Sequence, residues 1–129
     1  MRIKCNKIIS PTTKEDLGDI SPWLKRGHEY TVLAMNWSSK FGMKVFIQSE
    51  HYNEPCFVDL EGFEILSQKI PSSWITTTRE FGDQLLVTML PKSWTAYTNF
   101  FEELEDEKKE AVALFNEAVE LIYREEGKV

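Results

Sequence analysis

Residues 93–126 read SWTAYTNFFEELEDEKKEAVALFNEAVELIYREE, and the spacing of their apolar side chains decides the fold class. These side chains recur three or four positions apart along most of the stretch, as on one face of an α-helix: Trp94, Tyr97, Phe101, Leu104, Ala111, Phe115, Ala118 and Ile122. Ser93 can cap the start of the helical region and Gly127 can end it. One long helix fits the pattern as well as a short and a long helix that separate near Glu105 and Asp106, with Asp106 capping the second.

A series of β-strands is predicted before this helical region. Runs rich in β-branched and aromatic residues alternate with glycine, proline and small polar residues, which is typical of strands joined by turns. The expected strands cover 2–9, 29–37, 43–49, 56–60, 63–66, 74–79 and 84–90. Residues 84–90 are almost wholly apolar, which indicates a buried strand. Turns are expected at 27, 38–42, 51–55, 61–62 and 81–83.

The composition is that of one globular domain. The chain has 129 residues, of which 42% are apolar and 28% charged, and a chain of this size buries roughly two-thirds of its surface. We expect a single domain over 1–129, β-rich over 1–90 and helical over 91–129. Its class is α+β: a small antiparallel β-barrel or bent sheet, on which the C-terminal amphipathic helix packs through Phe101, Leu104, Phe115 and Ile122.

The N-terminal residues predict neither a secretory signal peptide nor a membrane span. Arg2, Lys4 and Lys7 interrupt the opening segment, and no long apolar run follows them. A cytoplasmic protein that does not enter membranes is therefore expected. Two cysteines, Cys5 and Cys56, are too few for a disulfide framework.

Negative charge is concentrated in the helical region. The chain carries a formal net charge of −6, and residues 101–126 hold ten acidic side chains against Lys108, Lys109 and Arg124, a net of −7. The remaining residues therefore sum to +1. A surface with one concentrated sign attracts and steers a partner of the opposite sign. The acidic balance makes general nucleic-acid binding an unfavourable expectation, because phosphates are neutralised by basic side chains.

Five of the acidic residues are expected to form one row on the helix, on the side away from its apolar face. We call them the acidic row: Glu103, Asp106, Glu110, Glu117 and Glu120. The sequence predicts no (i, i+4) cation for the row, so it retains like-charge repulsion of a few tenths of a kcal/mol per pair. Most acidic rows of this kind are simply solvated, and the alternative interpretation is that the row binds a partner.

Four tryptophans are many for a chain of this length. Core packing is expected for at least three of them, because a buried ring removes a large apolar area from water. Trp23 follows Pro22 in a long predicted loop, so it is the tryptophan expected to be exposed. Exposed tryptophans anchor protein interfaces, and Trp23 is therefore added to the candidate partner-binding residues.

No catalytic or cofactor-binding motif stands out. Cys5, His28, His51 and Cys56 could in principle form a Cys2His2 set, but their spacings match no paired zinc pattern. Cys56 beside His51 is an equally weak candidate for nucleophilic catalysis, and a buried free cysteine is the ordinary interpretation. Glycine-rich phosphate loops and the common hydrolase motifs are not found in the sequence. We expect no cofactor, no metal and no enzymatic activity.

Residues 24–33 (LKRGHEYTVL), followed by Pro55 and by residues 61–65 (EGFEI), resemble small SH3-like barrel domains of bacteria. The resemblance covers residues 1–66 and implies an SH3-like barrel fold for them, without an assigned activity. A compact barrel with an acidic helix is also similar in style to bacterial immunity proteins, a likeness that no residue motif carries.

Three functions are weighed. The preferred one is a non-enzymatic immunity protein that neutralises a basic, nuclease-type toxin by occlusion with its acidic row. The first alternative is an SH3-like nucleic-acid-associated or regulatory module, whose footprint would be Arg2, Lys4, Lys7, Lys14, Lys25 and Arg26. The second is a small enzyme that uses His51 and nearby carboxylates. The sequence leaves open the partner's identity, the oligomeric state and whether the row is functional or only solvated.

Overall fold

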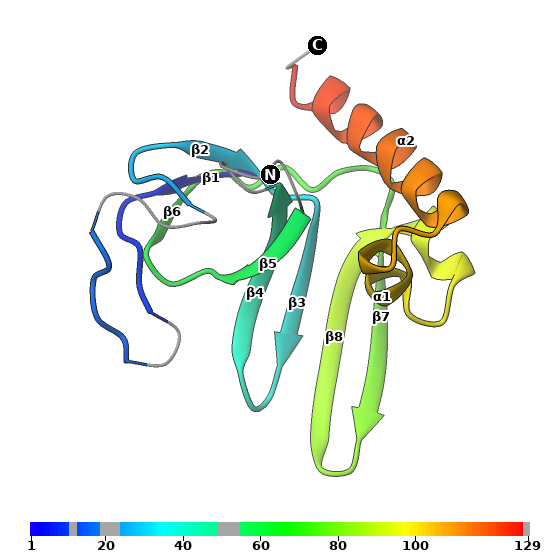
Figure 1. Cartoon of the computed structure of the whole chain (residues 1–129), viewed down its shortest axis with the longest axis horizontal. Helices are drawn as coiled ribbons and strands as arrows, with labels where there is room; N and C mark the ends of the chain where they lie inside the picture. Colours follow the sequence, from blue (N-terminus) through cyan, green and yellow to red (C-terminus); the bar gives the residue numbers. More distant parts are fainter. Residues whose placement is uncertain (11–12, 19–23, 49–54, 128–129) are drawn as a thin grey trace.

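The computed structural model describes residues 1–10, 13–18, 24–48 and 55–127. Within these residues the strands form two antiparallel sheets, and the helices follow them (Figure 1). The strands are β1 (Arg2–Cys5), β2 (Glu29–Thr31), β3 (Ala34–Ser38), β4 (Gly42–Gln48), β5 (Pro55–Asp59), β6 (Phe63–Ser67), β7 (Trp74–Phe81) and β8 (Gln84–Pro91).

The two sheets are separate and do not close into a barrel. The small sheet has the order β2-β1-β6 and the large sheet the order β5-β4-β3-β8-β7. The expected α+β class with antiparallel strands and C-terminal helices is confirmed, and the expected closed barrel is wrong. The reason lies in the pairing: β6 joins β1 and not β5, while the β7–β8 hairpin extends the large sheet beyond β3. Strands β5 and β7 therefore remain as its opposite edges.

The predicted strand over 29–37 is divided between the two sheets. β2 pairs with β1 in the small sheet, and β3 pairs with β4 and β8 in the large one. Val32 and Leu33 make the crossing, where their side chains are fully buried. Their backbone N–H groups donate to the carbonyls of Met1 (2.9 Å) and Phe46 (2.8 Å). The buried backbone N–H groups at the crossing therefore remain hydrogen-bonded. The sequence pattern over 29–37 is continuous, so it does not indicate where the chain changes sheets.

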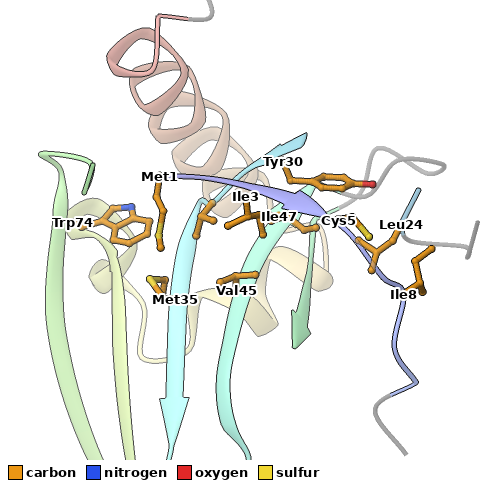
Figure 2. Close-up of a cluster of buried hydrophobic side chains, with 11 residues drawn as sticks. Met1, Ile3, Cys5, Ile8, Leu24, Tyr30, Met35, Val45, Ile47 and Trp74 are labelled. Atoms are coloured by element: carbon orange, nitrogen blue, oxygen red, sulfur yellow. The ribbon is translucent and has the colours of Figure 1, made fainter. Parts of the chain in front are cut away.

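One hydrophobic core fills the space between the two sheets (Figure 2). Ile3 and Tyr30 contribute to it from the small sheet, and Met35, Val45 and Ile47 from the large sheet. Successive side chains of a strand point to opposite faces. The odd-numbered residues Met35, Val45 and Ile47 therefore face this core, and their even-numbered neighbours are left for the other side of the sheet.

The helical region is interrupted, as one of the two predictions had it. A 3-10 turn, η1 (Lys92–Ala96), precedes α1 (Phe100–Glu105) and α2 (Lys109–Glu125). Ser93, the predicted cap, lies within η1, and α1 is capped by Asn99, whose side chain accepts a hydrogen bond of 3.3 Å from the backbone N–H of Glu102. Asp106 is the C-terminal cap of α1 rather than the cap of α2. Gly127 follows the last helical turn with φ +76°, as predicted.

The second hydrophobic core lies between the large sheet and the helices. Ala34, Phe46 and Leu90 supply its sheet side. Trp94 is fully buried at its centre, with its ring stacked on Phe100 at 4.5 Å between centroids. Its indole N–H donates to the carbonyl of Leu114 at 3.2 Å. The expected packing of the helices is confirmed, through residues that are buried or packed against this core: Phe101, Leu104, Phe115 and Ile122.

The C-terminal end of α2 is tied to the β-rich part of the chain. The Glu126 carboxylate, only 5% exposed, contacts the Met1 amino group and lies 3.3 Å from Arg2 Nε. Glu125 accepts two hydrogen bonds from Ser72, one from its backbone N–H (3.0 Å) and one from its hydroxyl (2.8 Å). These hydrogen bonds are the largest cause of a lowered Glu125 pKa. Two of the acidic residues of the helical region are therefore used to attach the helix.

The hairpins β3–β4 and β7–β8 extend beyond the small sheet and the helices (Figure 1). Trp37 is 38% exposed there and Leu85 is 37% exposed, so the strand predicted as buried over 84–90 is only partly so. Trp74 and Trp94 are buried, as expected. Because Trp37 is exposed, the expectation of at least three core tryptophans depends on Trp23, which lies outside the described residues.

The described helices include none that is both long and apolar enough to cross a membrane.

Candidate protein-binding surface

The structure distributes the acidic row over two helices and the turn between them. Glu103 lies on α1, Asp106 caps it, and Glu110 lies in the first turn of α2. Glu117 and Glu120 lie further along α2. Glu103 is half-buried and the other four side chains are exposed. Of the two predicted arrangements the interrupted one is found, and the α1–α2 turn divides the row into two parts.

The row also differs from the prediction in one ion pair. Arg124 Nη2 lies 2.6 Å from Glu120 Oε1, an (i, i+4) pair that the sequence analysis did not anticipate. Within the part of the chain that the structure describes, the other four carboxylates of the row form no ion pair. In the β-rich part Glu29 pairs with Arg2 at 3.4 Å and Glu61 with Lys14 at 3.1 Å, while Glu64 and Glu80 are exposed and form no ion pair among the described residues. The excess of negative charge on the helical side is therefore one of net charge, −7 over residues 101–126 against +1 for the rest of the chain.

Glu103 and Glu110 act on the same neighbour, Tyr97. Partial desolvation raises the pKa of the Tyr97 hydroxyl, and the negative charges of Glu110 and Glu103 raise that pKa further. Two carboxylates from different helices therefore contribute to the field at one point. This part of the acidic row remains together despite the interruption of the helix.

The α1–α2 turn is built by a backbone motif that normally ends in glycine. The N–H of Lys108 donates to the carbonyl of Glu103 (3.1 Å), and the N–H of Glu107 donates to that of Leu104 (3.0 Å). This is the Schellman arrangement, whose left-handed residue is most often glycine. Here Glu107 occupies it with φ +56°. A left-handed conformation costs a residue with a side chain about 1 kcal/mol, so this turn keeps an exposed carboxylate at some cost in stability.

A hollow of about 600 Å³ opens beside this turn, between α1, α2 and strands β4 and β5. Its aromatic side is formed by Phe46, Phe57 and Phe101, whose ring centroids lie 4.7 to 4.9 Å apart. Glu105 and Glu107 are its acidic lining residues. We call it the turn hollow; its remaining lining residues are Gln48, Pro55, Cys56, Leu104, Val112, Phe115 and Asn116.

Sequence reasoning missed the turn hollow and its two carboxylates. Glu105 and Glu107 do not belong to the acidic row that the sequence analysis defines, although Glu107 follows Glu103 by four positions and precedes Glu110 by three. The signal that could have found them is the predicted break near Asp106, where three consecutive acids occupy a helix–helix turn. Phe57 could not be assigned from the sequence, because its contact with Phe101 joins segments far apart in the chain.

Two residues of the sequence-based hypotheses lie outside the described residues: Trp23, the candidate interface anchor, and His51, the candidate for catalysis and for metal binding. Among the residues that the structure does describe, no three His, Cys, Asp or Glu side chains gather as a metal site would require. Burial raises the pKa of the Cys56 thiol to about 11. Cys56 is therefore a protonated and weakly nucleophilic thiol at neutral pH.

No protein-family model, curated protein or solved structure matches the chain.

Proposed function

We propose that this protein binds a basic protein partner through the acidic surface of α1, the α1–α2 turn and α2, and that it acts without catalysis. The observation that carries the proposal is a set of carboxylates, most of them exposed and without an ion-pair partner among the described residues, that lie beside the turn hollow with its aromatic side. In the preferred form of the proposal the partner is a nuclease-type toxin, and this chain is its immunity protein.

The physical basis is a difference in net charge between the two parts of the molecule. Residues 101–126 carry a net charge of −7, whereas the charges of the rest of the chain sum to +1, and some of its carboxylates, such as Glu29 and Glu61, have cations beside them. Asp106, Glu110 and Glu117 form no ion pair within the described residues, and their side chains are exposed to water. A basic partner would supply the missing cations and would be steered toward this surface from a distance.

Occlusion would follow from the shape of the surface. The helices rest on a rigid base, because Trp94 and Phe115 pack them onto the large sheet. A rigid acidic surface can cover the basic groove with which a nuclease holds phosphates, and needs no chemistry of its own. Charge complementarity would set the rate of encounter, while partly exposed aromatic side chains at the hollow would slow dissociation.

The nucleic-acid alternative is less well supported by the same ion pairs. Of its expected basic footprint, Arg2 lies beside Glu29 and Glu126, and Lys14 lies beside Glu61. Basic side chains that already have carboxylate partners must give them up before they can neutralise phosphates. A titration of single-stranded RNA separates the two functions, since the protein-binding proposal expects no retained complex.

The proposal is tested by affinity capture from a lysate of the source organism at low salt. The wild type is immobilised beside a row variant with Glu103→Gln, Asp106→Asn, Glu110→Gln, Glu117→Gln and Glu120→Gln. The matched control neutralises five exposed acids of the β-rich part: Glu15→Gln, Glu61→Gln, Glu64→Gln, Glu80→Gln and Asp83→Asn. Row variant and control carry the same net charge, so only the position of the lost charge differs between them.

The expected result is a basic protein that the wild type and the control retain and the row variant releases. The captured protein is then assayed for nuclease activity with and without this chain, and the wild type should block that activity. Equal retention by all three proteins, or capture of no basic protein at all, would contradict the proposed function.

A further inference from the structure

The turn hollow combines an aromatic side with acidic lining residues. Its aromatic side consists of Phe46, which is 4% exposed, and of Phe57 and Phe101, which are half-buried. All three rings line the hollow, and the half-buried Phe57 and Phe101 are the ones that a ligand could reach. The volume of about 600 Å³ lies within the range of ligand pockets, roughly 300 to 1,000 Å³.

Among the described residues that line the hollow, the charged ones all have the same sign. Glu105 and Glu107 line it and are exposed, and neither forms an ion pair within the described part of the chain. The nearby lysines, Lys108 and Lys109, are not among its lining residues. The Gln48 side-chain oxygen, which also lies there, is already engaged by the Tyr123 hydroxyl at 2.9 Å. No cation is therefore found among the described residues that line the hollow.

An arginine side chain meets both requirements of this lining. Its guanidinium group is planar and weakly hydrated, so it stacks on aromatic faces, and its donors pair with carboxylates in a bidentate manner. A lysine ammonium group is compact and strongly hydrated, and it gives up more hydration on entering an aromatic-walled hollow. The same lining therefore distinguishes between two side chains of equal charge.

We propose that the turn hollow is an arginine-binding site, in which a protruding arginine of the partner protein stacks against Phe57 and Phe101 and pairs with Glu105 and Glu107. This inference rests on the proposed function and specifies it. The acidic row steers the partner, and the turn hollow selects arginine over lysine. It also gives a reason for the carboxylate at the left-handed position of Glu107, which a glycine would occupy more easily.

The test uses three peptides that differ in a single side-chain chemistry. They are Gly-Arg, Gly-Lys and Gly-citrulline repeats of equal length, titrated into the isotopically labelled full chain and followed by amide NMR shifts. Citrulline has nearly the shape of arginine without its charge. We expect the arginine peptide to shift residues 105–108 and 57, with an affinity about two- to fivefold higher than that of the lysine peptide. The citrulline peptide should produce no shifts there.

Two pairs of variants assign the binding to the hollow. Glu105→Gln with Glu107→Gln should weaken the arginine peptide by about three- to tenfold, and the matched control Glu117→Gln with Glu120→Gln should preserve its preference over lysine. Asn116→Trp fills the hollow from an exposed helix position without changing the charge, and should abolish the preference, whereas Asn116→Ala should keep it. Circular dichroism establishes that each variant is folded.

Three outcomes would overturn the inference: equal affinity for the arginine and lysine peptides, binding of the citrulline peptide, or an arginine preference that survives Asn116→Trp. These failures differ from a failure of the proposed function. A protein captured through the acidic row without any arginine preference would retain the function and reject the arginine site. Loss of capture by every measure would reject both.

Discussion

At the scale of single residues, two positions with positive φ serve different purposes. Gly62 and Glu107 both have left-handed backbone conformations, but for different reasons. A Cβ atom at Gly62 would lie 2.5 Å from the carbonyl oxygen of Lys7, so glycine is needed for close packing of two segments. Glu107 has no such packing need, and its side chain is an exposed carboxylate at the turn hollow. The first residue therefore serves the fold, and the second is assigned to binding.

Replacing Gly62 should be among the most destabilising single changes in the β-rich part. The Gly62 carbonyl accepts hydrogen bonds from the N–H groups of Asn6 (2.9 Å) and Lys7 (3.0 Å). Gly62→Ala places a methyl group against the Lys7 carbonyl and strains a residue with φ +90°. We expect the free energy of unfolding in urea to fall by at least about 2 kcal/mol. Gly82→Ala is the control, because it has positive φ without a close neighbour; an equal effect of both would contradict the packing argument.

Because the pKa of the Cys56 thiol is raised, we expect the folded protein to lose stability at alkaline pH. Burial raises the thiol pKa from 9.0 to about 11, so the unfolded chain releases this proton at lower pH than the folded one does. The contribution of the protonated Cys56 thiol to the free energy of unfolding is fully present below pH 9 and is lost as the pH rises toward 11. Urea unfolding between pH 7 and 11 should therefore show a steeper decline for the wild type than for Cys56→Ser. Parallel curves would mean that the thiol titrates normally in the folded protein.

Helices and strands come from local sequence, but their assignment to sheets does not. The hairpin turns near Gly42 and Gly82 form where the sequence predicts them, and the helix break after Glu105 is one of the two alternatives that the sequence leaves open. The crossing at Val32 and Leu33 is different, because the residues on both sides of it have the pattern of a strand. The two strands are distinguished only by their pairing, β2 with β1 and β3 with β4. Elements with strong local signals were therefore predictable, and the change of sheet was not.

In the α1–α2 turn, a substitution that raises stability is expected to weaken binding. Glu107→Gly relieves the left-handed strain and should raise the free energy of unfolding by about 0.5–1 kcal/mol. It should also weaken the arginine peptide, since it removes a carboxylate of the turn hollow. Glu117→Gly makes the same charge change inside α2 and should instead lower stability by about 0.5–1 kcal/mol. A Glu107→Gly variant that is less stable than the wild type would contradict the assignment of strain to this turn.

At the scale of the whole molecule, the fold class and the site were predictable to different degrees. The alternation of β-like runs followed by a 3.6-residue period was enough for the α+β class and the packed helices. Barrel closure was not predictable, because it depends on whether β6 pairs with β5 or with β1. The acidic row was found from spacing alone, whereas the turn hollow required the contact between Phe57 and Phe101, which no local pattern contains.

The charge asymmetry is also a property of the whole molecule. Residues 101–126 hold a net charge of −7 within a chain of net −6. The charges of the β-rich part nearly cancel, so they contribute little to the field at a distance. A partner approaching from solution therefore meets a field dominated by the helical region, and this field is what the proposed function uses.

The measurement that tests this account most directly is the association rate of the captured basic protein with this chain as a function of salt concentration, followed by stopped-flow fluorescence. Screening weakens steering once the Debye length falls below about 10 Å, near 0.1 M salt. The account predicts a rate that falls roughly 10- to 1,000-fold from low to high salt for the wild type and for the control with neutralised β-rich acids. The row variant should start near the high-salt rate and change little. A wild-type rate that stays constant with salt would contradict the central claim.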